Sequence, residues 1–253
     1  MTNTPTSPAP GWYPAPDGSS QTWWWDGAGW TQPPTQAQYQ PEPSPAAINA
    51  IAKLATATQV LILVWVVTSV ATIGVEIFGL TAVADYLSGI DTTVDRLDLY
   101  DQGTAVVSIL SSLAIIAAGV IWVIWQFRVA KQVTGQTRRS PGWHAGSWFI
   151  PIVSFWFPYQ NVSDLWRALG RTRPSWLIVW WLLWVVGNYA IQLSSRAYLF
   201  AEDLEGFRAG MWLSLAGELL MLASAPMAWL VIRGITQGIV QRSSIPAPAS
   251  AAA

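Results

Sequence analysis

Residues 59–80 read QVLILVWVVTSVATIGVEIFGL, and this stretch decides the fold class because it is apolar almost from end to end. Further runs of the same kind lie at 105–127, 175–193 and 210–232. A helix of about 20 apolar residues crosses the roughly 30 Å of hydrocarbon in a bilayer. Backbone polar groups in lipid must be paired within the chain, which a helix achieves. The sequence therefore predicts an all-α integral membrane protein with four transmembrane helices.

Charged residues gather between these runs, and their sign changes from one connection to the next. Connection 81–104 holds five Asp and one Arg, whereas connection 128–174 holds seven Lys or Arg and one Asp. Short loops rich in Lys and Arg stay in the cytoplasm. We therefore expect a multi-pass plasma membrane protein with cytoplasmic N- and C-termini. Its basic loop would face the anionic inner leaflet of the lipid bilayer, and nucleic acid is not an expected partner.

The composition excludes several kinds of chemistry. The chain has no Cys, which excludes disulfides, thiolate metal sites and a cysteine nucleophile. Its single histidine, His144, lies between Trp143 and Ala145, so neither neighbour can complete a metal site or a catalytic pair. No Gly-rich phosphate loop is present. We therefore expect no metal, no cofactor and no enzymatic activity.

The N-terminal part of the chain has its own organisation. Residues 1–10 are predicted to be disordered, and 32–50 form a linker rich in Pro and Gln. Between them, 11–31 form a very small Trp-rich module in which two Asp-Gly pairs favour tight turns, so a short β-meander is expected. The membrane domain then spans 51–240, and 241–253 form a disordered tail.

The aromatic residues of this module form a candidate interaction surface. They are Trp12, Tyr13, Trp24, Trp25 and Trp30. Exposed aromatics suit a cytoplasmic protein or a Pro-rich peptide as partner. The alternative is that so small a unit uses its aromatic rings for its own core.

Residues 147–170 form the most unusual stretch of the chain. The apolar part is too short to cross a bilayer and is interrupted by Pro151 and Pro158, so we expect a cytoplasmic re-entrant or interfacial segment. After Pro158, apolar residues recur at helical spacing, which predicts an amphipathic helix on the inner leaflet. This segment either packs the cytoplasmic ends of the spans or forms a re-entrant gate or lipid-binding pocket. Its signature residues are Trp148, Pro151, Pro158, Tyr159, Trp166 and Arg167.

Two stretches resemble known families. The order Pro141-Gly142-Trp143, Gly146-Ser147-Trp148-Phe149-Ile150-Pro151, Pro158-Tyr159-Gln160 and Leu165-Trp166-Arg167-Ala168 resembles domain of unknown function 4328, a family of bacterial multi-span membrane proteins. The N-terminal Gly11-Trp12-Tyr13-Pro14 and Trp24-Trp25-Asp26-Gly27 resemble domain of unknown function 2510. The resemblances imply a membrane architecture with a companion module, and neither implies a substrate.

Small and polar residues, joined on the third run by two tryptophans, fall on one face of each run. Such residues allow close helix contact and interhelical hydrogen bonds, so they predict the inward faces of a four-helix bundle. These residues are Thr68, Thr72, Glu76 and Gly79; Ser108, Ser112 and Gly119; Trp181, Trp184, Asn188 and Gln192; and Gly210, Ser214, Gly217 and Glu218.

Glu218 stands out because it lies deep within a predicted span. An acid at such depth costs roughly 2.5–3.5 kcal/mol, so it should face inward and find partners. Asn188 and Ser112 fall at similar depth and complete a candidate polar cluster, with Glu76 nearer the outer surface. The cluster either relays protons or cations, or is a hydrogen-bonded structural group.

Two functions remain open. The first is a scaffold or regulatory interaction protein at the cytoplasmic face of the plasma membrane, for which a homo-oligomer is one candidate assembly. The alternative is a small transporter or channel component that uses intramembrane Glu218.

Overall fold

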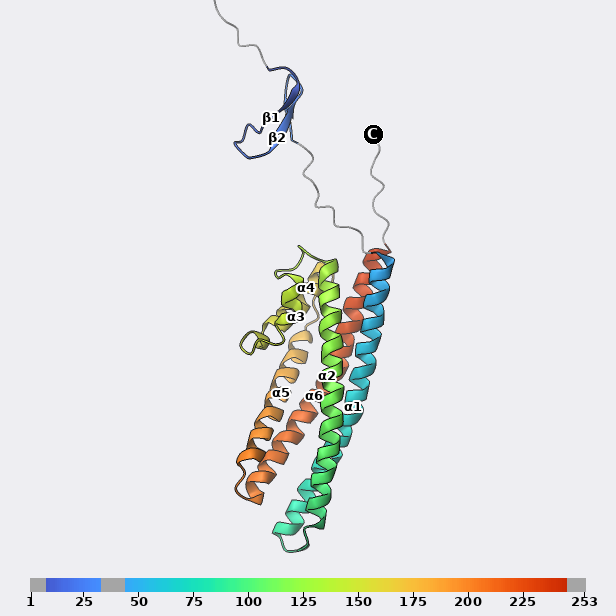
Figure 1. Cartoon of the computed structure of the whole chain (residues 1–253), viewed down its shortest axis with the longest axis vertical. Coiled ribbons are helices and arrows are strands. Elements are labelled where there is room, and N and C mark those ends of the chain that lie inside the picture. The colour runs from blue at the N-terminus through green and yellow to red at the C-terminus, as the bar shows by residue number, and fades with distance from the viewer. Residues whose placement is uncertain (1–7, 33–43, 245–253) are drawn as a thin grey trace, which may run out of the picture. The chain divides into compact units, whose positions relative to one another are not determined.

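The computed structural model describes residues 8–32 and 44–244. The chain divides into two compact units, residues 1–42 and 43–253. The first contains three short strands, and the second contains the long helices (Figure 1). Each unit is described by itself.

The first unit is a three-stranded antiparallel sheet in the order β1-β2-β3, so the predicted meander is confirmed. Its strands are β1 (Gly11–Pro14), β2 (Thr22–Trp25) and β3 (Trp30–Thr31). Both predicted turns use a glycine with positive φ, Gly18 at 76° and Gly27 at 100°. Of the predicted disordered segment 1–10, residues 1–7 lie outside the described residues.

The second unit is built on four long helices, each apolar and long enough to cross a membrane. They are α1 (Pro45–Leu87), α2 (Asp95–Gln132), α5 (Leu177–Phe200) and α6 (Leu204–Ser243). The predicted spans 59–80, 105–127 and 210–232 each lie within one of them, whereas 175–193 begins two residues before α5. The predicted predominance of helix is confirmed.

All four helices extend beyond the apolar runs. The Ser44 side chain accepts from the Ala47 amide and caps α1, with Pro45 in the first turn. Residues 45–50, predicted as linker, are therefore helical. Helix α6 continues through Ser243 into the predicted C-terminal tail, and residues 245–253 lie outside the described residues.

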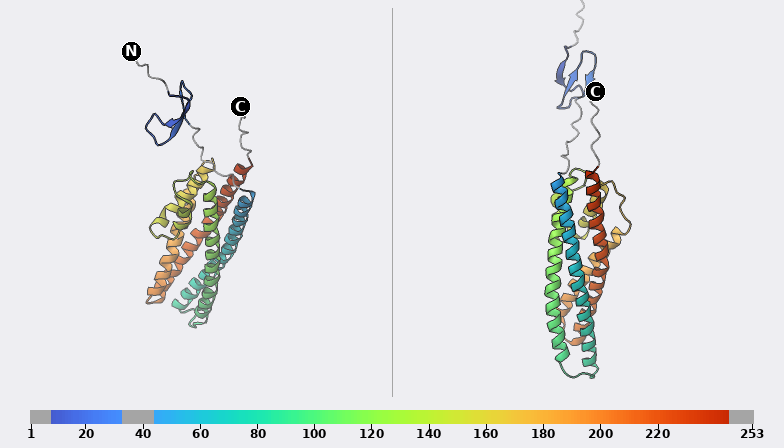
Figure 2. Two further views of the ribbon diagram at one scale, coloured as in Figure 1. Left: turned by 45° about the horizontal axis from the view of Figure 1, so that its top comes forward. Right: turned by 90° about the vertical axis from the view of Figure 1, so that its right-hand side faces the viewer.

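The long helices pack in the order α2-α1-α6-α5. The ends of α2 and α6 and the starts of α1 and α5 share one end of the unit (Figures 1 and 2). The basic connection 133–176 lies at this end, which we call the basic end. The connections 88–94 and 201–203 lie at the opposite end, which we call the acidic end.

Three short helices occupy the basic end. They are α3 (Pro141–Gly146), η1 (Val153–Phe155) and α4 (Phe157–Ala168). The side chains of α4 join a large apolar core that includes Trp125 of α2, Leu177 of α5 and Ile235 of α6. This core fixes the end of each long helix around the 147–170 segment.

Helices α5 and α6 approach each other closely through two glycines. A Cβ built on Gly217 would lie 3.0 Å from the carbonyl oxygen of Gly187, and a Cβ on Gly187 would lie 3.1 Å from the carbonyl oxygen of Gly217. Only hydrogen side chains allow this backbone contact.

The predicted inward face of α1 is largely right, but that of α2 is wrong. Glu76 and Gly79 are buried, whereas Ser108, Ser112 and Gly119 of α2 are exposed. Alanines such as Ala114 and Ala118, together with large tryptophans, form the buried face of α2 instead. These alanines are as compatible with close packing as serine, so residue size alone did not identify the correct face.

Candidate functional site

Two buried carboxylates lie on the inward faces of α1 and α6. Glu76 is 3% exposed and Glu218 is 8% exposed. The carboxylate of Glu218 accepts a hydrogen bond from the hydroxyl of Ser69, on α1. The sequence pattern did not single out Ser69.

The predicted polar cluster is therefore brought together only in part. Asn188 lies on α5, where its Oδ1 accepts from Gln192 Nε2 at 2.6 Å. Ser112 is exposed on α2, on the side away from the core. Neither residue is the hydrogen-bond partner of Glu218.

Glu76 has a separate set of hydroxyl partners. Tyr100 of α2 donates to its Oε2 at 3.2 Å, and Tyr198 of α5 donates to its Oε1 at 3.3 Å. Ser214 of α6 also lies beside this carboxylate. No Lys or Arg forms an ion pair with either carboxylate in the described part of the chain. Each acid can therefore be held by hydroxyl groups, and each can carry a proton that it shares with them.

Trp148 connects the two edge helices of the bundle. Its Nε1 donates to Gln126 Oε1 of α2 at 2.9 Å. Its ring meets Trp122 of α2 edge-on at 6.0 Å and Trp184 of α5 at 5.4 Å. Helices α2 and α5 lie at opposite ends of the packing order, so this single side chain links helices that otherwise have few direct contacts.

Gln126 is the polar centre of this arrangement. It is fully buried, and its Oε1 also accepts from Trp122 Nε1 at 3.1 Å. Its Nε2 has no hydrogen-bond partner among the described residues. The sequence offered no signal for Gln126 beyond one polar residue near the end of an apolar run.

Polar contacts tie α4 to the connection before it. Arg138 Nε lies 2.9 Å from Asp164 Oδ2, and Arg138 Nη2 lies 2.8 Å from Asp164 Oδ1. This ion pair raises the pKa of the Arg138 guanidinium. Asn161 Nδ2 donates to the Trp143 carbonyl and to Ser147 Oγ, both at 3.0 Å. These contacts hold α3 against α4.

The remaining signature residues have different surroundings. Pro151 is exposed, and Pro158 is buried in the first turn of α4. The Tyr159 ring lies 5.8 Å from the Arg173 guanidinium, and Arg167 is exposed. Trp166 packs against Gly234 of α6, where an added Cβ would lie 2.4 Å from its ring.

The apolar face of α4 packs against the helix bundle, whereas the sequence predicted an amphipathic helix on the inner leaflet. Its apolar residues Val162 and Leu165 are fully buried in the bundle core rather than turned away from it. Asp164 of the same helix is only 5% exposed and forms an ion pair with Arg138. The pattern identified a two-sided helix, but periodicity does not say which apolar surface the helix meets.

His144 is fully buried in α3. Burial lowers its pKa to about 4, Asp164 acts in the opposite direction and Arg139 adds to the lowering. Neither ring nitrogen has a hydrogen-bond partner in the described part of the chain. His144 is therefore neutral at pH 7 and belongs to the packing of this end.

The sheet of the first unit displays several aromatic rings. Trp12 is 59% exposed and packs edge-on against Trp24, with 5.5 Å between ring centroids. Trp25 and Trp30 pack at 5.0 Å, and Tyr13 meets Trp30 at 6.1 Å. The sheet thus places the five predicted surface residues in two groups, Trp12 with Trp24, and Tyr13 and Trp25 with Trp30. Successive residues of a strand point to opposite faces, so the two groups lie on opposite faces of the sheet.

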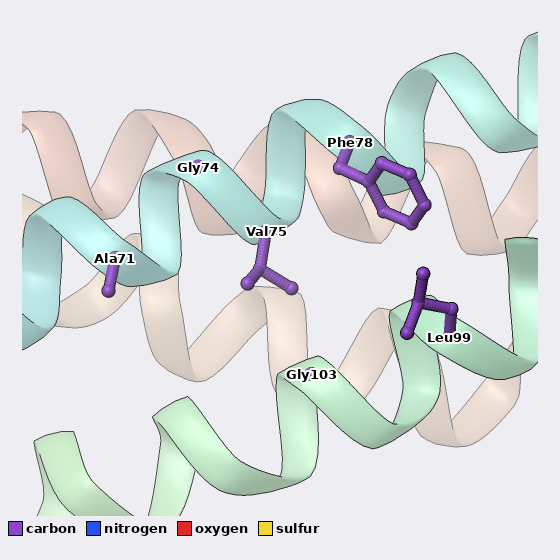
Figure 3. Close-up of a pocket in the computed structure, with 6 residues that line it drawn as sticks. All are labelled: Ala71, Gly74, Val75, Phe78, Leu99 and Gly103. Carbon is purple, nitrogen blue, oxygen red and sulfur yellow. The ribbon is translucent and has the colours of Figure 1, made fainter.

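Two cavities lie along the long helices. The smaller, of about 350 Å³, is an apolar notch between α1 and α2 lined by residues such as Gly74 and Gly103 (Figure 3). The larger, of about 520 Å³, we call the tryptophan groove. It is lined by Ile62, Trp65, Ile115, Ile116, Ala118, Gly119, Val120, Trp122, Val123, Trp148, Phe149, Trp180, Trp184, Asn188, Met221, Ser224, Ala225 and Ala228. Among the described residues no group of His, Asp and Glu could hold a metal ion.

The fold defines a class of protein with four helices long and apolar enough to span a membrane, and with short helices α3, η1 and α4 at one end of them. The family model described as domain of unknown function (DUF4328) matches residues 89–237, which is more than half of the chain. The chain therefore belongs to this family, and that resemblance is confirmed. No curated protein and no solved structure matches the chain.

Proposed function

We propose that the protein is a multi-pass plasma membrane protein that acts as a scaffold or regulatory interaction protein at the cytoplasmic face. The four apolar helices support the membrane placement. The separation of basic from acidic connections supports cytoplasmic termini, since Lys and Arg are retained inside. On this placement the basic end, with α3 and α4, lies in the cytoplasm.

The exposed Trp12–Trp24 pair is the observation that carries the interaction role. Two exposed indoles meeting edge-on present apolar area together, which suits a Pro-rich peptide or another cytoplasmic segment. The sheet is short, so a partner would gain most of its contact from these rings. The similarity of this module to domain of unknown function 2510 belongs to the same proposal.

A pull-down from solubilised membranes tests the interaction role. The Trp12→Ala/Trp24→Ala variant removes two exposed rings, and Ser20→Ala is its matched control at an exposed turn position of the same unit. We expect partner recovery to fall with the double variant and to persist with Ser20→Ala. Equal recovery from all three proteins would remove the interaction role.

The topology has its own test, which is a reporter that is active only after export, fused to the chain after Ser140.

A second candidate function is transport through the buried carboxylates. Glu76 and Glu218 lie inside the bundle with hydroxyl partners and without ion-pair partners in the described part of the chain. An ionisable residue inside a span marks a functional site by default. Glu218→Gln in sealed vesicles should change proton-coupled flux if Glu218 relays protons, and wild-type vesicles without such flux would remove this candidate.

A further inference from the structure

The tryptophan groove lies where the bundle is least closed. Helices α2 and α5 are the edges of the packing order, and the groove is lined from both of them, with α1 and α6 also contributing. Trp148 and Phe149, from the segment between α3 and η1, complete the lining. Its volume of about 520 Å³ is within the range of small-molecule binding pockets.

The lining is almost entirely apolar, which favours a hydrocarbon occupant. Indole rings, aliphatic side chains and small residues such as Gly119 and Ala118 make up most of it. A Cβ built on Gly119 would meet nothing within 4 Å, so the space beside this residue is open. In a bilayer, the apolar molecules that surround such a groove are lipid chains.

Polar atoms beside the groove add a second requirement. Trp180 lines the groove and is 2% exposed, and its Nε1 has no hydrogen-bond partner among the described residues. Gln126 Nε2, beside Trp148 and Trp122, is also buried without a partner there. Both atoms are donors, and a buried donor without an acceptor is costly. An occupant with an acceptor oxygen would therefore be favoured over a plain hydrocarbon.

Charge favours an anionic lipid. Exposed Arg128 and Lys131 follow Gln126 on α2, at the basic end. Anionic headgroups of the inner leaflet are attracted to such residues.

We propose that the tryptophan groove binds one acyl chain of an anionic bilayer phospholipid, with the ester carbonyl of that chain accepting from Trp180. The chain fills the apolar part of the groove, and the carbonyl supplies the missing acceptor when the Trp180 ring turns its buried Nε1 toward the groove. Trp148 closes the basic end of the groove because it is hydrogen-bonded to α2 and packed on α5. This inference rests on the membrane placement proposed above.

Photocrosslinking tests the proposal on the full chain. The purified protein is reconstituted into vesicles of phosphatidylcholine and phosphatidylglycerol, where the phosphatidylglycerol carries a diazirine in one acyl chain. Flotation on a density gradient first reports whether the protein is embedded, so a failure of the membrane placement is seen separately. After irradiation, adducts are mapped by peptide mass spectrometry.

Two glycine variants provide the matched comparison. Gly119→Leu fills the groove, whereas Gly74→Leu fills the notch of Figure 3, and an added Cβ meets nothing within 4 Å at either position. Adducts on groove residues should fall about tenfold in Gly119→Leu, which corresponds to about 1.4 kcal/mol of binding free energy. They should stay at the wild-type level in Gly74→Leu. An embedded wild-type protein without groove adducts, or equal adducts in both variants, would overturn the proposal.

A competition experiment tests the carbonyl. Unlabelled ester-linked phosphatidylglycerol should displace the probe from the wild-type protein more effectively than its ether-linked counterpart, which has the chains but no carbonyl. In Trp180→Phe the two competitors should be equivalent, because the donor is gone. Equal displacement in the wild-type protein would overturn the role assigned to Trp180.

Discussion

The close contact between α5 and α6 predicts that Gly217→Ala destabilises the protein, because the distances leave no room for a methyl group. Gly217→Ala places a methyl group 2.7 Å from Ile191 Cγ1, 3.0 Å from the Ile191 amide nitrogen and 3.0 Å from the Gly187 carbonyl oxygen. Two of these three atoms belong to the backbone, so the methyl group can be accommodated only if the helices move apart.

The magnitude follows from two opposing effects. Replacing glycine by alanine inside a helix is favourable by about 0.5–1 kcal/mol, because glycine is the poorer helix former. Overpacking of a tight contact costs typically about 1–3 kcal/mol. At Gly217 we expect a net loss of about 1 kcal/mol in the free energy of unfolding. At Gly119 an added Cβ meets nothing within 4 Å, so Gly119→Ala should show the favourable effect alone.

Unfolding of the purified protein in detergent micelles, followed by tryptophan fluorescence during titration with a denaturing detergent, measures both variants. We expect Gly217→Ala to unfold at a lower denaturant concentration than the wild-type protein, and Gly119→Ala at an equal or higher one. The reasoning is refuted if Gly217→Ala is as stable as Gly119→Ala.

Three further predictions concern the basic end. Burial lowers the pKa of His144 to about 4, from 6.5 for an exposed histidine, so the folded state binds the proton less readily than the unfolded state. The free energy of unfolding should therefore fall as the pH drops below about 6.5, by at most ~1.4 kcal/mol per pH unit. His144→Leu should flatten that dependence in thermal unfolding curves between pH 7 and pH 5; an unchanged slope would show that another group titrates. Arg138→Gln should lower the free energy of unfolding by about 1–2 kcal/mol, because Arg138 makes charge-assisted hydrogen bonds to Asp164. Arg167→Gln should lower it by less than about 0.5 kcal/mol, because Arg167 lies 3.9 Å from the same carboxylate. Trp148→Phe should cost about 1 kcal/mol by removing the donor to Gln126 while keeping an aromatic ring, and a melting temperature equal to that of the wild-type protein would contradict the importance of this bond.

The apolar runs predicted the four long helices because hydropathy over about 20 residues is a strong signal. The positions of Asp17-Gly18 and Asp26-Gly27 predicted the turns of the small sheet for a similar reason, since glycine readily adopts positive φ. The ends of α1 and α6 were less predictable, because polar helical turns beyond an apolar run resemble linker in composition. Ser44 and Pro45 carried the missing signal for the start of α1.

The candidate site was only partly predictable. The depth of each residue in its predicted span suggested that Glu218 lies beside Asn188 and Ser112. The rotation of each helix about its own axis makes Ser69 the partner of Glu218 instead. Helical periodicity fixes which residues share a face, but it does not fix which neighbouring helix that face meets. For the same reason the sequence did not reveal that Gln126 and Trp148 join helices α2 and α5.

The packing order α2-α1-α6-α5 has a consequence for biogenesis. Consecutive helices form two antiparallel hairpins, α1 with α2 and α5 with α6, and the seam between hairpins is the contact of α1 with α6. Each hairpin can thus assemble as it leaves the insertion machinery, before its counterpart has been synthesised. The seam can close only after α6 emerges, so the last helix to be made completes the assembly by joining the first.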